Sequence, residues 1–231
     1  MHYVPIGLSF FLALFFLFLL LVVLIELRVL QYAYGRIGVS PRYMLALLLL
    51  SFLGSYVNIP VVQLPPEQVY SDKIVTFFGV PHVVPAVTHW PGTVIAVNLG
   101  GAVVPAILSV YLVLKNRLYG SSLAAVAVVT TAVHAMASPV PGVGIVVPIF
   151  LPPVVAAISA LVVSRRHAAP LAYIGGALGT LIGGDLLNLD KVQGLGAPVA
   201  SIGGAGKFDS IFLTAILAVL LASLFTRHST D

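Results

Sequence analysis

The sequence has no cysteine and very little charge. Only 8% of its 231 residues are Asp, Glu, Lys or Arg. The lack of cysteine excludes disulfides, thiol nucleophiles and thiolate-bound metals. The formal net charge of +4 comes from basic residues that occur singly or in pairs. A nucleic-acid-binding protein would carry a basic patch, so no nucleic-acid partner is expected.

Two sequence motifs of hydrolases are also missing. The chain has no H-E-x-x-H segment, which would bind zinc, and no G-x-S-x-G segment, which would carry a serine nucleophile. His82 and His89 could bind a metal together with Glu67 or Asp72, but their spacing matches no standard site. We therefore predict no metal and no other cofactor.

Apolar sequence dominates the chain. Hydrophobic residues make up 60% of it and the mean hydropathy is +1.11, whereas a soluble domain is roughly 45–50% apolar. About 20 consecutive apolar residues cross a bilayer as a helix. The sequence therefore predicts an all-α fold, a polytopic bundle of transmembrane helices in a single domain over residues 1–231. Its surroundings would be the lipid bilayer, and its location the cell membrane.

Seven apolar runs are predicted to be membrane spans, over residues 6–26, 43–62, 94–114, 122–137, 144–163, 170–189 and 210–225. With the N-terminus outside, eight of the eleven Lys and Arg residues fall inside and three outside. Because basic residues favour the inner side, this count predicts an N-out, C-in topology. The loop over residues 63–93 would be external, and its β-branched and aromatic segment from Gln68 to Phe78 favours a short strand or hairpin.

Two acidic residues border a Gly-rich connector near the C-terminus. Asp185 lies within the sixth predicted span, and Asp209 directly precedes the seventh. A charged group at membrane depth costs roughly 2.5–3.5 kcal/mol on insertion scales, so its default interpretation is functional. Structural alternatives stay open, because Asp209 could cap a helix and Asp185 could pair with Lys191 or Lys207.

A pair of carboxyl groups at this depth would suit hydrolysis. Two carboxyl groups that face each other across a water share one proton, because two like charges at close range cannot both ionise. One then serves as general base and the other as general acid, without metal. We predict Asp185 and Asp209 as the catalytic pair, with a transmembrane peptide or protein as substrate. The predicted substrate-binding residues are Gly184, Asn188, Gly204, Gly206, Asn58 and Pro198.

Four segments carry a resemblance to a known family. GSYVNIPV, SPVPGVGIVVP, LGTLIGGDLLNL and ASIGGAGKFDSIFL resemble the archaeal and bacterial multipass membrane proteins known as the domain of unknown function 1614 family. That family is remotely similar to presenilin, signal peptide peptidase and prepilin peptidase. These are intramembrane proteases with one Asp in each of two neighbouring helices, the second in a G-x-G-D motif.

The resemblance implies that Asp185 is the first catalytic aspartate and Asp209 the second. Three features depart from the proteases. The segment Ile182-Gly183-Gly184-Asp185 keeps only the glycine next to the acid. Lys207 and Phe208 separate Asp209 from the segment Gly204-Ala205-Gly206, so the glycine motif is not contiguous. The Pro-Ala-Leu element of presenilins has only a weak counterpart in Ala197-Pro198-Val199.

Two other function classes remain open. A transporter or channel could use the same acids to bind cations or protons at helices broken by proline and glycine. A scaffold could use the glycines that recur every four residues in the sixth span, because small residues let another helix approach closely. The substrate and the oligomeric state stay open, as does the question whether one cavity collects Asn58, Asn98 and His134.

Overall fold

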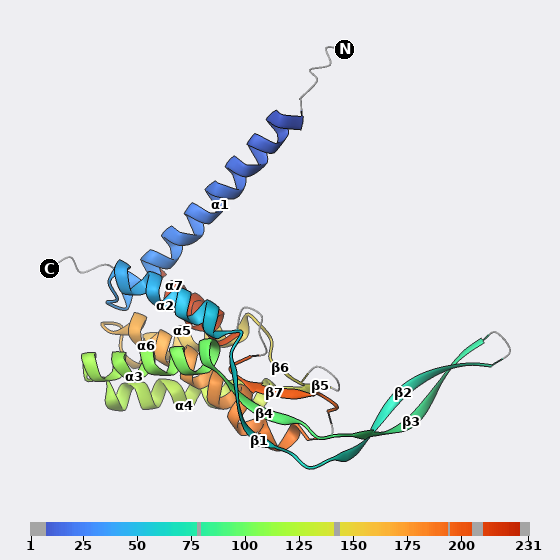
Figure 1. Ribbon diagram of the computed structural model, residues 1–231. Helices are drawn as coiled ribbons and strands as arrows, with labels where there is room; N and C mark the ends of the chain where they lie inside the picture. Colours follow the sequence, from blue (N-terminus) through green and yellow to red (C-terminus); the bar gives the residue numbers. More distant parts are fainter. Residues whose placement is uncertain (1–7, 78–79, 141–143, 194, 205–209, 227–231) are drawn as a thin grey trace.

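A computed structural model describes residues 8–77, 80–140, 144–193, 195–204 and 210–226 of the chain. This part of the chain is mostly helical (Figure 1). Its α-helices are α1 (Leu8–Arg36), α2 (Pro41–Gly54), α3 (Val104–Asn116), α4 (Tyr119–Met136), α5 (Leu151–Val163), α6 (Ala168–Thr180) and α7 (Ser210–Leu224). Its strands are β1 (Asn58–Gln63), β2 (Glu67–Phe77), β3 (Val80–Trp90), β4 (Val94–Asn98), β5 (Ser138–Val140), β6 (Gly144–Val146) and β7 (Val199–Ile202).

Several helical segments are long and apolar enough to cross a membrane, which identifies an integral membrane protein. The described residues contain four such segments: Leu14–Arg36, Leu99–Asn116, Tyr119–Met136 and Ala168–Lys191. Helices α2, α5 and α7 have 14, 13 and 15 residues. At 1.5 Å per residue these three helices reach about 20 Å, less than the hydrocarbon core of about 30 Å. The count of seven spans therefore stays a prediction.

Helix α6 is the centre of the bundle. Nearly all of its residues are buried, and α3, α4, α5 and α7 pack around it. The predicted small face is confirmed: Gly175, Gly179 and Gly183 lie against α4. A Cβ atom on Gly179 would lie 2.6 Å from Cβ of Val129, and one on Gly183 would lie 2.4 Å from the carbonyl oxygen of Thr130. Glycine is needed at both positions for this helix contact.

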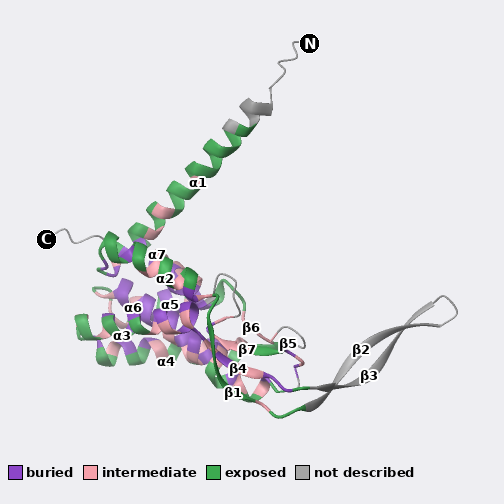
Figure 2. Cartoon of the chain, in the orientation of Figure 1, coloured by how far each residue is buried: buried purple, intermediate pink, exposed green. Residues whose placement is uncertain are grey.

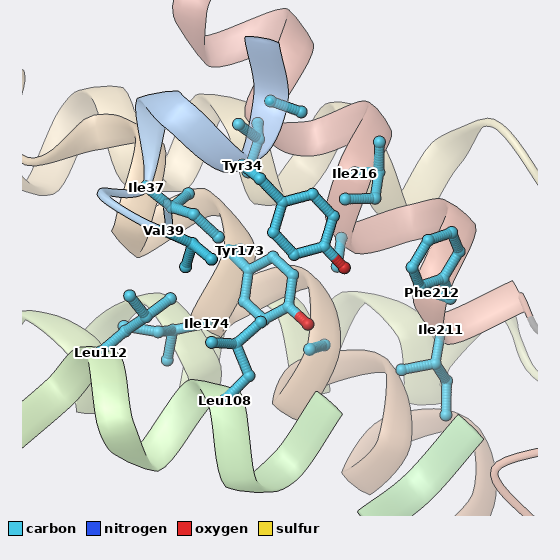
Figure 3. Packing of buried hydrophobic residues seen from close by; sticks show 14 of the residues in the cluster. Tyr34, Ile37, Val39, Leu108, Leu112, Tyr173, Ile174, Ile211, Phe212 and Ile216 are labelled. Carbon is cyan, nitrogen blue, oxygen red and sulfur yellow. The ribbon is translucent and has the colours of Figure 1, made fainter. Parts of the chain in front are cut away.

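Helix α1 joins the bundle only at its C-terminal end. Tyr34 and Ile37 pack with Leu112, Tyr173 and Ile216 in one buried cluster (Figure 3). The rest of α1 extends away from the other helices and is exposed along most of its length (Figure 2). Most of its exposed side chains are Leu, Phe, Val and Ile, which suits a helix surrounded by lipid.

The prediction of an all-α fold is wrong, because β5 and β6 form a two-stranded sheet, with β6 inside the stretch predicted as the fifth span, and a three-stranded sheet covers one end of the bundle. Its strand order is β1-β4-β7, with β1 antiparallel and β7 parallel to β4. Residues 58–62 and 94–98, which were expected inside the second and third spans, are strands of this sheet. Both segments are short and rich in β-branched residues, and Pro60, which has no N–H, lies where the register of β1 and β4 shifts.

The predicted hairpin is confirmed and is longer than expected. Strands β2 and β3 have 11 residues each and pair from Glu67 opposite Trp90 to Phe77 opposite Val80. The hairpin extends away from the helices (Figure 1), and among the described elements its two strands pack extensively only on each other.

The ends of several helices that carry basic residues meet at one end of the bundle. Nε of Arg36 donates to Oγ of Ser223 at 3.2 Å, and Nη2 donates to the carbonyl oxygen of Thr226 at 3.0 Å. Nζ of Lys115 donates to the carbonyl oxygen of Gly38 at 2.7 Å. Arg36 and Lys115 therefore lie at the same end of the bundle, and the N-out, C-in topology stays a prediction.

Candidate active site at the end of helix α6

Helix α6 continues into a widened turn that carries Asp185. The α-helix ends at Thr180, a π-helical turn (η2) covers Leu181–Asp185, and a 3₁₀ turn (η3) covers Leu186–Lys191. Such single π turns frequently occur at functional sites, because they change the direction of side chains within a helix. The glycines of η2 allow the close approach of α4 at the same place.

Asn188 closes this irregular turn. Its Nδ2 donates to the carbonyl oxygens of Gly183 and Gly184 at 2.8 and 3.0 Å, and its Oδ1 accepts from Nζ of Lys191 at 2.7 Å. The side chain is fully buried. Asn188 therefore gives two carbonyl groups of the π turn a side-chain hydrogen bond each. Lys191 donates to Asn188, and the proposed pairing of Lys191 with Asp185 is not formed.

Asp185 is half-buried and is held by a backbone amide. The N–H of Gly203 donates to Oδ2 of Asp185 at 2.7 Å. Gly203 has φ +89°, and a Cβ atom there would lie 2.5 Å from the amide nitrogen of Ala102. Only glycine satisfies both the left-handed backbone and this close approach. No other described residue donates a hydrogen bond to the carboxyl group.

A cavity of about 180 Å³ opens beside Asp185. Asp185 and Leu189 line one side, Gly144 and Ile145 of β6 contribute another, and all four residues of β7 line the cavity as well. Successive residues of a strand point to opposite faces. A cavity lined by four consecutive strand residues therefore runs along the edge of the strand, and β7 is an edge strand whose other edge pairs with β4.

A polar network supports β7 from the side of the sheet. Nδ2 of Asn98 donates to the carbonyl oxygen of Ser55 at 2.7 Å and to Oδ1 of Asn58 at 3.0 Å. Oδ1 of Asn98 accepts from the N–H of Gly101 at 2.8 Å. Oγ of Ser201 on β7 lies 2.6 Å from Oδ1 of Asn58. These bonds tie β1, β4 and β7 together and fix the strand that borders the cavity.

The predicted site residues divide into those that line the cavity and those that shape it. Asp185 and Gly204 line it. Asn188 holds the π turn, and Asn58 joins the polar network of the sheet. The carbonyl oxygen of Pro198 accepts from the N–H of Val94 at 3.1 Å, which secures the start of β7.

Three further predicted positions have other surroundings or lie outside the described residues. Gly184 lies against α4 and Val147, because a Cβ atom there would be 3.7 Å from side-chain carbons of Val133 and Val147. Asp209 and Gly206 lie outside the described residues. The pairing of Asp185 with Asp209 therefore stays a prediction.

His134 and Asn98 do not line the cavity, which answers part of the question left open by the sequence. Nδ1 of His134 is buried without a hydrogen-bond partner. Asn98 is structural, because both ends of its amide bond to residues of the sheet and its flanking turns.

Sequence reasoning missed Gly203 and Ser201. Two adjacent glycines, at 203 and 204, follow the short apolar segment that forms β7, and this pattern is typical of a turn with unusual backbone angles. That signal could have identified Gly203. Ser201 had no comparable signal, since its role depends on the pairing of β7 with β4.

The family of the chain is shown by a comparison with protein-family models. The model described as protein of unknown function (DUF1614) matches residues 52–221, a range that contains the sheet, the cavity and helices α3 to α6. No curated protein and no solved structure matches the chain.

Proposed function

The chain belongs to the DUF1614 family, and we propose that it is an intramembrane aspartyl hydrolase, similar to presenilin, that cleaves peptide bonds of a transmembrane substrate. One observation supports this proposal above the others. Asp185 has one carboxyl oxygen held by the N–H of Gly203, and it lies beside a cavity that runs along the edge of β7. A carboxyl group inside an apolar bundle is expensive, and this one is oriented toward an open space.

Asp209 is the proposed second acid. It directly precedes α7, whose residue Ala215 packs against Gly176 of α6. In the proposed reaction one carboxylate removes a proton from a water, and the oxygen of that water attacks the peptide carbonyl. The other carboxyl group donates its proton to the carbonyl oxygen. As the C–N bond breaks, the group that took the proton from water gives it to the departing amine, and a hydroxyl of the new carboxylic acid returns a proton to the other carboxylate.

The edge of β7 supplies what a transmembrane substrate needs at the site. A peptide bond in a helix is shielded, because its N–H and C=O groups are bonded within the helix, and a chain that unwinds in the bilayer loses these bonds. An extended segment paired with a free strand edge regains main-chain hydrogen bonds. Pairing with β7 would place the substrate backbone alongside Asp185.

Asparagine variants of the two acids test the proposal. Asp185→Asn and Asp209→Asn should each reduce cleavage by at least about a hundredfold, since each removes one member of the acid–base pair. Asp190→Asn is the matched control, because Asp190 is exposed on the neighbouring 3₁₀ turn. The measurement is mass spectrometry of peptides cut within transmembrane segments, in membranes that contain each variant.

Cleavage that persists in either Asp185→Asn or Asp209→Asn, in a folded protein, would contradict the proposal. A transporter is the second candidate, favoured by the two π-helical interruptions, η1 (Leu99–Val103) and η2, which are joined through Gly203. It predicts that Asp185→Asn changes proton or cation flux in proteoliposomes, with no cut peptides in any variant.

A further inference from the structure

A second cavity lies between helices α2 and α3 and shares no lining residue with the Asp185 cavity. Its volume is about 570 Å³, which falls within the range of about 300–1,000 Å³ that is usual for small-molecule sites. Tyr111 and Lys115 of α3 form one wall. We refer to this cavity as the α2–α3 groove.

The α2 wall of the groove changes from polar to apolar along the helix. Its lining residues Ser40, Tyr43, Leu47 and Leu50 follow a helical spacing of three and four, so they share one face of α2. At 1.5 Å per residue, the distance from Ser40 to Leu50 is about 15 Å, or half of a hydrocarbon core of about 30 Å. The lining along α2 is therefore about as long as one lipid leaflet is deep.

Lys115 provides a positive charge at the polar end. Its Nζ donates to the carbonyl oxygen of Gly38 at 2.7 Å and lies 5.5 Å from the ring centre of Tyr111. An ammonium group has three donors, so donors remain for another acceptor. Within the described part of the chain no carboxylate pairs with Lys115. The charge thus lies at the mouth of the groove with no anionic partner among the described residues.

We propose that the α2–α3 groove binds an anionic phospholipid. The phosphate group contacts Lys115, and one acyl chain lies along Leu47 and Leu50. Tyr43 and Tyr111 flank the level of the headgroup, where amphipathic rings are favoured at membrane interfaces. This inference is independent of the proposed hydrolase activity.

Lipid binding to the full-length chain in a non-ionic detergent tests the proposal. Native mass spectrometry would compare phosphatidylglycerol with phosphatidylcholine of the same acyl chains, and a separate arm would add inorganic phosphate. We expect a preference for phosphatidylglycerol, and Lys115→Gln should weaken its binding about fivefold, the effect of one basic residue near a lipid surface. Arg166→Gln is the control, because Arg166 is exposed in the loop between α5 and α6 and the same charge is removed.

A second pair of variants tests the acyl part of the groove. Ala46 lines the groove, so Ala46→Phe fills it and should weaken the binding of both lipids. Leu45→Phe, at the exposed neighbouring position outside the groove, should leave lipid binding unchanged. If Lys115→Gln fails to fold, Lys115→Arg takes its place, and it should keep the preference for phosphatidylglycerol.

Three outcomes would overturn the proposal. Equal binding of the two lipids would show that the groove does not select an anionic headgroup. Wild-type binding by folded Lys115→Gln would show that Lys115 does not contact the phosphate. Complete displacement of the lipid by inorganic phosphate would show an anion site without an acyl chain.

Discussion

At the scale of single residues, the candidate site depends on glycine and asparagine as much as on the acid. The N–H of Gly203 donates a hydrogen bond to Asp185. Asn188 donates hydrogen bonds to carbonyl oxygens of the π turn that contains Asp185. The sequence made Asp185 a candidate because a carboxyl group among apolar residues is costly wherever the helix packs. It could not identify the donor at Gly203, since that contact depends on how β7 pairs with β4.

Gly203→Ala tests the importance of this donor. The new methyl group would meet the amide nitrogen of Ala102, and the backbone would keep an angle that L-residues rarely adopt. We expect a loss of about 1–3 kcal/mol in stability and a roughly tenfold or greater loss of cleavage. Thermal unfolding in detergent measures the first effect, and the peptide assay the second. Gly120→Ala is the control, because open space surrounds that position; equal behaviour of the two variants would show that Gly203 is not constrained.

Asn98→Ala tests the polar network behind β7. The change removes bonds to Ser55, Asn58 and Gly101 in a buried setting, and unpaired polar groups there cost about 1–3 kcal/mol each. We expect a clear drop in the midpoint of thermal unfolding. Asn116→Ala removes a side-chain bond only to the carbonyl of Leu112 in its own helix. A drop no larger than that of Asn116→Ala would contradict the structural role of Asn98.

At the scale of helices and strands, small residues set how closely α6 meets its neighbours. The glycine spacing in the sequence was sufficient to predict this face, because residues four apart share one side of a helix. Hydropathy was insufficient for β1 and β4. Each is a short run of apolar and β-branched residues next to an apolar helix. Hydropathy alone cannot tell whether such a run extends the helix or forms a strand.

Alanine at two positions of the α6–η2 face should have opposite effects. Gly183→Ala would bring a methyl group to 2.4 Å from the carbonyl oxygen of Thr130 and should destabilise the bundle by about 1–3 kcal/mol. At Gly175 the nearest atom would be 3.5 Å away, so Gly175→Ala should be neutral or slightly stabilising. Thermal unfolding of the two purified variants measures the difference. Similar midpoints of thermal unfolding for the two variants would show that α4 can shift away from position 183 without a loss of stability.

At the scale of the whole molecule, the helical bundle and the long hairpin are largely separate. The apolar composition predicted a helical membrane protein because spanning segments must satisfy their own backbone hydrogen bonds. The length of the hairpin was not predicted, since the sequence favoured only a short strand or hairpin from Gln68 to Phe78, whereas β3 runs from Val80 to Trp90 through Pro81 and Pro85. The second acid, Asp209, is a prediction from the sequence alone.

Replacement of residues 67–90 by a short Gly-Ser turn should leave the bundle folded. Strands β2 and β3 pack extensively only on each other among the described elements, so their loss exposes little of the helices. We expect a midpoint of thermal unfolding within a few degrees of the wild type, because surface changes away from packed features usually alter stability by no more than about 0.5 kcal/mol. Failure of this variant to fold would place the hairpin among the elements that stabilise the bundle.

The bond between Gly203 and Asp185 has a consequence for how the protein can change over time. The donor belongs to the main chain, so replacement by any residue other than proline keeps the N–H group itself. A replacement alters the backbone angles at position 203, which orient this N–H group toward Asp185. The orientation of the Asp185 carboxyl group thus depends on the backbone conformation at Gly203. Neighbouring side chains can change in evolution as long as that conformation is kept.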